Sequence, residues 1–175
     1  EVARILRKRN VAAVAVCFMN AFTNGANEAR MKRILEEELP GVTITTSSEV
    51  LPEIFEHERF STTVVNAILA PVVGSYCERL ADRLREGGYA RDLLLLHSGG
   101  GVMTAKGARH FAARLAGSGI AAGAIASRYI ASQCGFPNSI GLDMGGTSCD
   151  VSLAWDGKSR VTKDWHIEFG YPIRF

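Results

Sequence analysis

Two short, almost wholly apolar segments constrain the fold of this 175-residue chain most strongly. Residues 11–19 read VAAVAVCFM, and residues 93–96 are four consecutive leucines. A strand that is apolar at nearly every position is typical of a parallel or mixed sheet with both faces covered. Because helical patterns lie between such strands, the sequence predicts an α/β domain with helices packed on a mixed sheet.

The first strand is followed by a predicted helix. Asn24 or Asn27 can cap this helix, and Pro40-Gly41 ends it before a second strand at residues 42–46.

A long helix is expected next, from a cap at Ser61 or Thr62 to about residue 85, with a kink at Pro71. Its inward side chains are predicted at the apolar positions Val65, Ile68, Leu69, Val72, Val73, Tyr76, Leu80 and Leu84.

Glycine is concentrated in the second half of the chain. Of 18 glycines, 15 lie between Gly87 and Gly170, against a usual share of about 7% of all residues. The predicted elements there are a strand at 93–97, a loop at 98–101, a helix from a Thr104 cap to about 113, a loop at 117–123 that opens a helix to about 133, and strands at 139–143, 151–155 and 159–162. The turn Asp156-Gly157 joins the last two strands as a hairpin.

The chain is interpreted as a single fragment, residues 1–175, of a longer polypeptide, because it starts inside an apparent helix. Residues 1–90 form a strand and helix segment, and residues 91–175 form a glycine-rich segment. Neither a signal peptide nor an apolar membrane span is visible. The cysteines are widely spaced without a C-x-x-C pair, so we expect four free thiols and a cytoplasmic location.

The charge balance argues against two classes of partner. Twenty basic and 18 acidic residues give a net charge of +2, whereas nucleic-acid-binding and polybasic membrane proteins carry a clustered basic face. The basic clusters at residues 7–9 and 79–85 are interpreted as solvated helix faces. We therefore expect neither a nucleic acid nor a membrane as partner.

The strongest chemical signal is DMGGTSCD, residues 143–150, between two predicted strands. Gly145 and Gly146 let bare N–H groups approach a ligand, and concave arrays of such donors bind anions. Thr147 adds a hydroxyl donor. Asp143 is placed to bind Mg²⁺ or to orient a nucleophile, and Asp150 could do the same or hold the hairpin.

The alternative for this motif is a glycine hairpin in which Asp143 merely caps a turn. A chance match to D-x-G-G-T-x-x-D in a chain of this length has odds of about 10⁻⁴, given amino-acid usage near 6% each. We therefore interpret Asp143 and Asp150 as catalytic residues, Asp143 also as a metal ligand, and Gly145, Gly146 and Thr147 as phosphate-binding residues.

The motif resembles the phosphate hairpin of the actin, sugar kinase and Hsp70 ATPase superfamily, which has a ribonuclease H-like fold. Nearly the whole chain is also similar to the central part of the hydantoinase A and 5-oxoprolinase family, which includes N-methylhydantoinases and subunits of acetone and acetophenone carboxylases. The segments that carry the resemblance are residues 47–53 (SSEVLPE), 58–67 (ERFSTTVVNA), 98–104 (SGGGVMT), 143–151 and 170–172 (GYP). The chain departs from the family pattern at residues 97–101, at Ile120 and at Cys149, which leaves the substrate subgroup open.

The resemblance implies ATP as cofactor, together with Mg²⁺ or another divalent metal. It implies an ATP-dependent hydrolase that opens a cyclic amide such as a hydantoin or 5-oxoproline by phosphate activation of a carbonyl. The alternatives are a ketone carboxylase subunit, a non-catalytic structural subunit and, less in keeping with the other segments, a sugar kinase. It further implies a small-molecule substrate, a hydantoinase B-like partner subunit and a hetero-oligomer.

One limit follows from the same resemblance. Superfamily members bind nucleotide between two related halves, each with a phosphate hairpin, and residues 1–175 contain one such motif. We therefore expect the isolated chain to bind ATP weakly and to be inactive, with a second hairpin upstream.

Several other residues are candidates by resemblance. Ser98, Gly100, Gly101, Gly119 and Gly123 are assigned to cofactor binding, although Gly119 and Gly123 could equally permit a close helix contact. His97 is expected to pack or to form hydrogen bonds at the end of its strand rather than to bind a metal. Ser48 and Glu49 also resemble the family, and Glu49, Glu53 and Glu58 could serve acid/base chemistry or form a charged loop face. Arg59 and Asn66 are expected to be structural, with Asn66 hydrogen-bonded.

Overall fold

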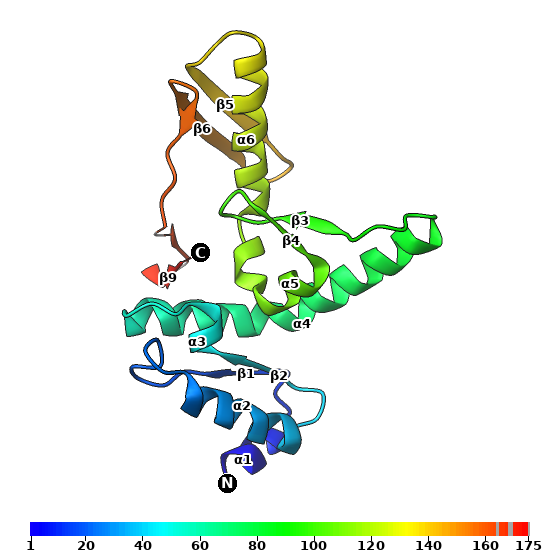
Figure 1. The fold of residues 1–175 in the computed structure, drawn as a ribbon, viewed down its shortest axis with the longest axis vertical. Helices are drawn as coiled ribbons and strands as arrows, with labels where there is room; N and C mark the ends of the chain where they lie inside the picture. Colours follow the sequence, from blue (N-terminus) through cyan, green and yellow to red (C-terminus); the bar gives the residue numbers. More distant parts are fainter. Residues whose placement is uncertain (164, 168–169, 175) are drawn as a thin grey trace.

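The structure is a computed structural model that describes residues 1–163, 165–167 and 170–174. Its elements lie in three tiers along the long axis of the molecule (Figure 1). The N-terminal strands form the first tier, the long helix α4 (Glu56–Glu86) crosses the middle, and α6 (Ser118–Gln133) forms the far end with a β-hairpin. The described strands form four small sheets, so the expected helices and strands are present without joining into one sheet.

The first tier is a parallel strand pair with helices against it. Strand β1 (Ala13–Val16) pairs in parallel with β2 (Thr43–Thr46), and α2 (Ala26–Glu38) connects them. Its core consists of Val16, Leu35, Leu39 and Ile44. The predicted strand, helix, strand order is therefore confirmed, with α1 (Val2–Lys8) before it and the short helix α3 (Ser47–Val50) after it.

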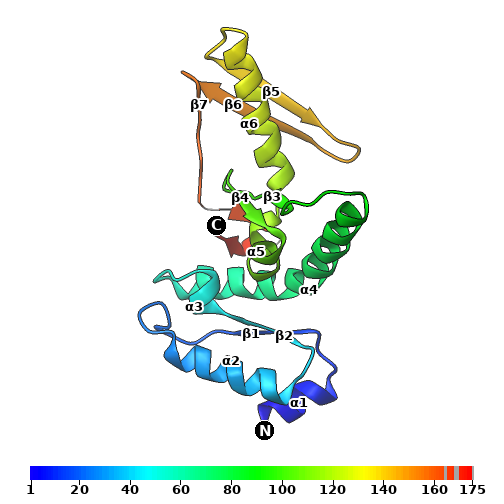
Figure 2. The same ribbon diagram turned by 45° about the vertical axis from the view of Figure 1, so that its right-hand side comes forward.

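Helix α4 is longer than predicted, because it begins at Glu56 rather than at Ser61 or Thr62. It continues through Pro71 and bends near its middle, where this proline lies (Figures 1 and 2). The bend agrees with the predicted kink, since a proline inside a helix removes a hydrogen bond and displaces the preceding turn.

The buried face of α4 differs from the prediction. The predicted inward residues Ile68, Val72 and Tyr76 are 65%, 70% and 55% exposed. The buried residues are instead small or polar: Arg59, Thr62, Thr63, Asn66, Ala67, Ala70, Gly74 and Cys77. Polar side chains occupy this face because they find hydrogen-bond partners there, for example Asn66, which joins α4 to the segment after α5 (Ala105–His110).

By length and composition alone, α4 would pass as a membrane-spanning helix, with a mean hydropathy of 1.3 over 18 residues. Its contacts argue for a different role. It packs against β1 and β2 on one side and against α5 and a later 3₁₀ helix, η1 (Ala112–Leu115), on the other. Such packing on two sides is typical of the central helix of a globular fold.

The second half contains elements that the sequence pattern did not predict, namely η1 and the strands β4 (Val102–Thr104), β8 (Trp165–His166) and β9 (Pro172–Ile173). Strand β3 (Leu94–Leu96) pairs antiparallel with β4, where the pattern indicated no strand. The Thr104 cap of α5 is confirmed, since its Oγ1 accepts a hydrogen bond of 3.2 Å from the Gly107 N–H. Helix α6 then leads to the far hairpin, β5 (Ser139–Met144) and β6 (Cys149–Trp155).

The end of the chain returns to the middle tier. The Asp156-Gly157 turn joins β6 to β7 (Lys158–Ser159), as predicted, although β7 is shorter than the expected strand at 159–162. Strand β9 (Pro172–Ile173) pairs with β8 (Trp165–His166) and packs on α4. Arg174 holds it there through ion pairs with Glu53 (3.0 Å) and Glu58 (3.5 Å).

Candidate functional site

The predicted phosphate motif forms the tip of the β5–β6 hairpin. Met144 pairs with Cys149, and the Gly145 N–H donates to the Ser148 carbonyl oxygen at 3.0 Å, so Gly146 and Thr147 form the turn. Neither Gly145 nor Gly146 has a positive φ, and a β-carbon at Gly146 would have no neighbour within 4 Å. Backbone strain and packing therefore do not require glycine at position 146, and the space beside its backbone is open to a ligand.

Asp143 and Asp150 are direct cross-strand partners next to this tip. Asp143 is exposed and Asp150 is half-buried. Two carboxylates that face each other repel unless a cation lies between or near them. The described residues contain no group of three or more His, Cys, Asp or Glu side chains that could hold a metal, so any cation here would be held by this pair.

Helix α6 lies along the hairpin face that carries Asp143. A β-carbon at Gly123 would come within 3.0 Å of the Asp143 Cγ, and one at Gly141 within 2.6 Å of the Ser127 Cβ. From Gly123 to Ser127 the helix advances by four residues, while the contacted strand residue goes back by two, from Asp143 to Gly141. Helix α6 and strand β5 therefore run antiparallel in close contact. Close packing is therefore one role of Gly123.

The start of α6 differs from the expected loop. Gly117, with a φ of 75°, is the N-cap, and the helix begins at Ser118, so Gly119 and Gly123 are helical. A β-carbon at Gly119 would meet nothing within 4 Å. The first turn of α6 contains no acidic residue, so the positive end of its dipole is not neutralised within that turn.

The glycine loop at residues 98–101 packs against the same helix. Ser98 is tied to the chain just before α6: its N–H donates to the Arg114 carbonyl at 2.8 Å, and its hydroxyl contacts the carbonyl oxygens of Arg114 and Ala116. Gly100 has a φ of 80°, and a β-carbon there would lie 3.2 Å from Ile125. The three glycine segments of the second half therefore all lie around α6.

His97 forms hydrogen bonds within this loop, as predicted. Its Nδ1 accepts from the Gly99 N–H at 3.1 Å, and a β-carbon at Gly101 would come within 2.7 Å of its Nε2. Burial, helped by the nearby Arg114 charge, lowers the pKa of His97, which favours the neutral ring that this bond requires.

Comparison with known proteins places this site in a family. Residues 59–175 match the family described as Hydantoinase/oxoprolinase, which is more than half of the chain. The chain belongs to the hydantoinase/oxoprolinase family. Over 90% of its own length, the chain is 37% identical to the caprolactamase alpha subunit of Pseudomonas jessenii. It is 33% identical to the acetophenone carboxylase gamma subunit of Aromatoleum aromaticum, also over 90% of the present chain.

A solved structure of nucleotide-free acetone carboxylase shares the fold. It matches 99% of the chain with a TM-score of 0.85 at 24% sequence identity. The chain covers only 25% of that protein chain, 23% of the caprolactamase subunit and 22% of the acetophenone carboxylase subunit. This hydantoinase/oxoprolinase-family chain thus spans about a quarter of the length of these three relatives, and its predicted α/β fold class is confirmed.

A buried polar cluster around Glu28 and Arg59 was not predicted from the sequence. Glu28, on α2, is fully buried and accepts hydrogen bonds from the Phe18 N–H (2.7 Å), the Ser47 hydroxyl (2.7 Å) and the Ser48 N–H (2.8 Å). Burial raises the pKa of Glu28, but these hydrogen bonds outweigh burial and hold it below its ordinary value. A glutamate on an otherwise polar helix gives no sequence signal of such burial.

Arg59 completes this cluster from α4. It is fully buried and donates to Ser47 Oγ at 3.2 Å, to the Glu53 carbonyl at 2.6 Å and to the Phe18 carbonyl at 3.1 Å. The guanidinium also lies over the ring of Phe60, 5.2 Å from its centroid. The cluster therefore ties the first tier to α4, which agrees with the structural role expected for Arg59.

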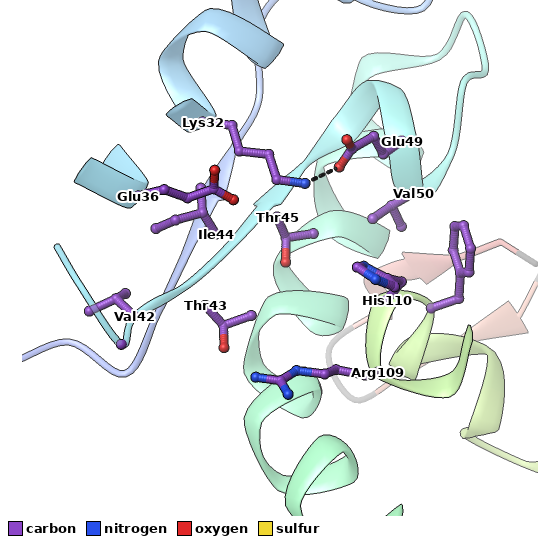
Figure 3. A pocket seen from close by; sticks show the side chains of 12 residues that line it. Lys32, Glu36, Val42, Thr43, Ile44, Thr45, Glu49, Val50, Arg109 and His110 are labelled. Atoms are coloured by element: carbon purple, nitrogen blue, oxygen red, sulfur yellow. Dashed lines mark hydrogen bonds and ion pairs between the residues drawn. The ribbon is translucent and has the colours of Figure 1, made fainter. Parts of the chain in front are cut away.

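The candidate acid/base glutamates are occupied by ion pairs. Glu49 pairs with Lys32 at 2.8 Å, while Glu53 and Glu58 pair with Arg174. Lys32 and Glu49 line a pocket of about 420 Å³ beside β2, together with Arg109 and His110 (Figure 3). This pocket lies between β2 and α5, and Glu53 and Glu58 are held by Arg174 beside α4, whereas the β5–β6 hairpin forms the far end of the molecule (Figure 1). The structure therefore does not bring these glutamates to the phosphate motif.

Proposed function

We propose that this chain is part of an ATP-dependent enzyme that activates the carbonyl of a cyclic amide for hydrolysis. The observation that carries the proposal is the hairpin tip, where the open backbone of Gly146 adjoins the facing carboxylates Asp143 and Asp150. Backbone donors that are fixed before the reaction can clamp phosphate oxygens without reorganisation, which is how phosphoryl transfer is generally accelerated.

The residues at the tip fit a magnesium nucleotide. Mg²⁺ is usually bound by one or two carboxylates, several waters and the phosphates of the substrate, and Asp143 with Asp150 supplies such a pair. Thr147 is exposed and offers a hydroxyl donor beside them. ATP would supply a phosphoryl group that makes a stable carbonyl open to attack, and the chain's own residues would orient the nucleotide.

The cyclic amide is favoured by the relatives. The family takes its name from hydantoinases and oxoprolinases, and a relative at 37% identity is named a caprolactamase. A ketone carboxylase is the second candidate, because a relative at 33% identity is an acetophenone carboxylase subunit. Both relatives are named as subunits, which supports a partner subunit in a hetero-oligomer. A hydantoinase B-like chain is the partner that we propose.

ATP consumption by the full-length protein, with its partner subunit where one is needed, tests the proposal. ADP release is measured with hydantoin, 5-oxoproline and caprolactam, and separately with acetone and acetophenone plus bicarbonate. We expect release with a cyclic amide and its loss in Asp143→Asn. Release only with ketone and bicarbonate would establish the carboxylase instead, and no release with any substrate would leave a structural subunit.

A further inference from the structure

The β5–β6 hairpin carries large apolar side chains on the side away from α6. We call this the apolar hairpin face; it comprises Ile140, Leu142, Met144, Val151, Leu153 and Trp155. Each of these side chains is between 64% and 78% exposed. The register places Ile140 opposite Leu153 and Leu142 opposite Val151, so they form one continuous patch.

The opposite face of the hairpin carries small or polar residues. Gly141 and Ala154 are buried there, and Asp143, Asp150 and Ser152 alternate with them. A hairpin with one solvated face normally turns its large apolar side chains toward the packed layer and its polar ones toward water. Here the arrangement is reversed: α6 packs on the face of small and polar residues and leaves the apolar hairpin face exposed.

No helix covers the apolar hairpin face in the part of the chain that the structure describes. Figures 1 and 2 show α6 on one side of the hairpin and no second helix on the other. A continuous exposed patch of large apolar side chains is typical of an interaction site. The face also contains no charged side chain, which is typical of a domain core or an obligate contact rather than a transient interface.

We propose that a helical layer of the same polypeptide, from outside residues 1–175, packs on the apolar hairpin face. The length of the relatives supports this occupant, since the chain covers only 22% to 25% of them. Sheets in α/β folds carry helices on both faces, and α6 supplies one of the two layers. The missing layer would also reach Met144, next to Gly145, and would hold the hairpin tip from behind.

Thiol accessibility in the full-length protein tests this proposal. Cys149 pairs with Met144 and therefore lies beside the apolar hairpin face. Leu153→Cys is introduced into a Cys149→Ser background, which removes this native thiol. Cys134, exposed at the C-cap of α6, serves as the internal control. We expect a maleimide to label Cys134 rapidly and the introduced thiol at least tenfold more slowly in the monomer, with both labelled equally in urea.

The same experiment distinguishes other occupants. Labelling is repeated over a range of protein concentrations, with the oligomeric state followed by light scattering, and with and without a partner subunit. Equal labelling of both thiols in the folded monomer overturns the proposal. Protection that appears only on dimerisation or only with the partner subunit also overturns it, because the occupant is then a second copy or another chain.

A stability measurement gives an independent readout. Leu153→Glu in the full-length protein should lower the melting temperature by several degrees, because it places a charge beneath the covering layer. Gln133→Glu, at an exposed position at the end of α6, adds the same charge as a control. Equal melting temperatures for the two variants would contradict burial of the apolar hairpin face.

Discussion

The carboxylate of Asp143 lies against the backbone of Gly123 on α6, with no room for a side chain between them. A β-carbon at Gly123 would come within 3.0 Å of the Asp143 Cγ and 3.2 Å of its Cβ. The helix and the phosphate hairpin therefore depend on each other, since one glycine determines where this carboxylate lies.

Gly123→Ala should displace Asp143 and loosen the helix from the hairpin. We expect a loss of about 1–3 kcal/mol in the free energy of unfolding, as for other overpacked contacts, together with reduced ATP turnover of the full-length protein. Gly119→Ala is the matched control, because a β-carbon there meets nothing within 4 Å and alanine favours the helix. Urea unfolding and ADP release measure the two effects; equal results for both variants would contradict the contact.

Glu28 makes stability depend on pH in the acid range. Burial raises its pKa, but hydrogen bonds from Ser47, Ser48 and Phe18 lower the pKa by more, so that it lies below the ordinary value of 4.5. The contribution of Glu28 to the free energy of unfolding is therefore present above about pH 4.5 and is lost as the pH falls through the lower pKa of the folded state. Glu28→Gln should weaken this pH dependence and cost about 1–3 kcal/mol at pH 7. Urea midpoints of both proteins between pH 7 and pH 3 test this, and parallel curves would contradict it.

Cys17 should make stability depend on pH in the alkaline range. Burial, followed by the charge of Glu28, raises the pKa of its thiol to about 11 from 9.0. Since the folded state holds the proton more tightly, the contribution is complete below pH 9 and is lost as the pH rises toward 11. Cys17→Ala should flatten the stability curve across this range, as urea midpoints would show. An unchanged slope would contradict the raised pKa.

Asn66 joins α4 to the chain between α5 and η1. Its amide donates to the His110 carbonyl at 2.9 Å and accepts from the Ala113 N–H at 3.0 Å. Asn66→Ala leaves both backbone groups unpaired, so we expect a loss of about 1–3 kcal/mol in the free energy of unfolding. Ser75→Ala, at an exposed position of the same helix, should change it by less than about 0.5 kcal/mol. If Asn66→Ala lowered the free energy of unfolding no more than Ser75→Ala, the two hydrogen bonds of Asn66 would not stabilise the fold.

Local patterns in the sequence predicted several elements correctly because each depends on its own residues. The apolar run at residues 11–19 contains β1, Thr104 caps α5, and Asp156-Gly157 forms the turn between β6 and β7. Turn and cap residues act through backbone preferences that need no distant partner. The glycine hairpin of the phosphate motif was predicted for the same reason.

The errors arose where distant partners determine the outcome. Apolar spacing predicted that Ile68 and Val72 face inward on α4, whereas the buried face consists of small and polar residues. Asn66 and Arg59 are buried there because they meet backbone groups of other elements. Glu28 is buried for the same reason. The role of Gly123 also depends on a contact with Asp143, twenty residues later in the chain, which loop composition cannot show.

Titration calorimetry with Mg-ATP tests the central claim, that residues 143–150 bind the nucleotide phosphates. Full-length wild-type protein is compared with Asp143→Ala and with Asp92→Ala, an exposed aspartate outside the hairpin. We predict that Asp143→Ala weakens binding at least tenfold, or by about 1.4 kcal/mol, while Asp92→Ala binds like the wild type. The isolated chain of 175 residues should bind weakly. Binding that is unchanged in Asp143→Ala would contradict the account.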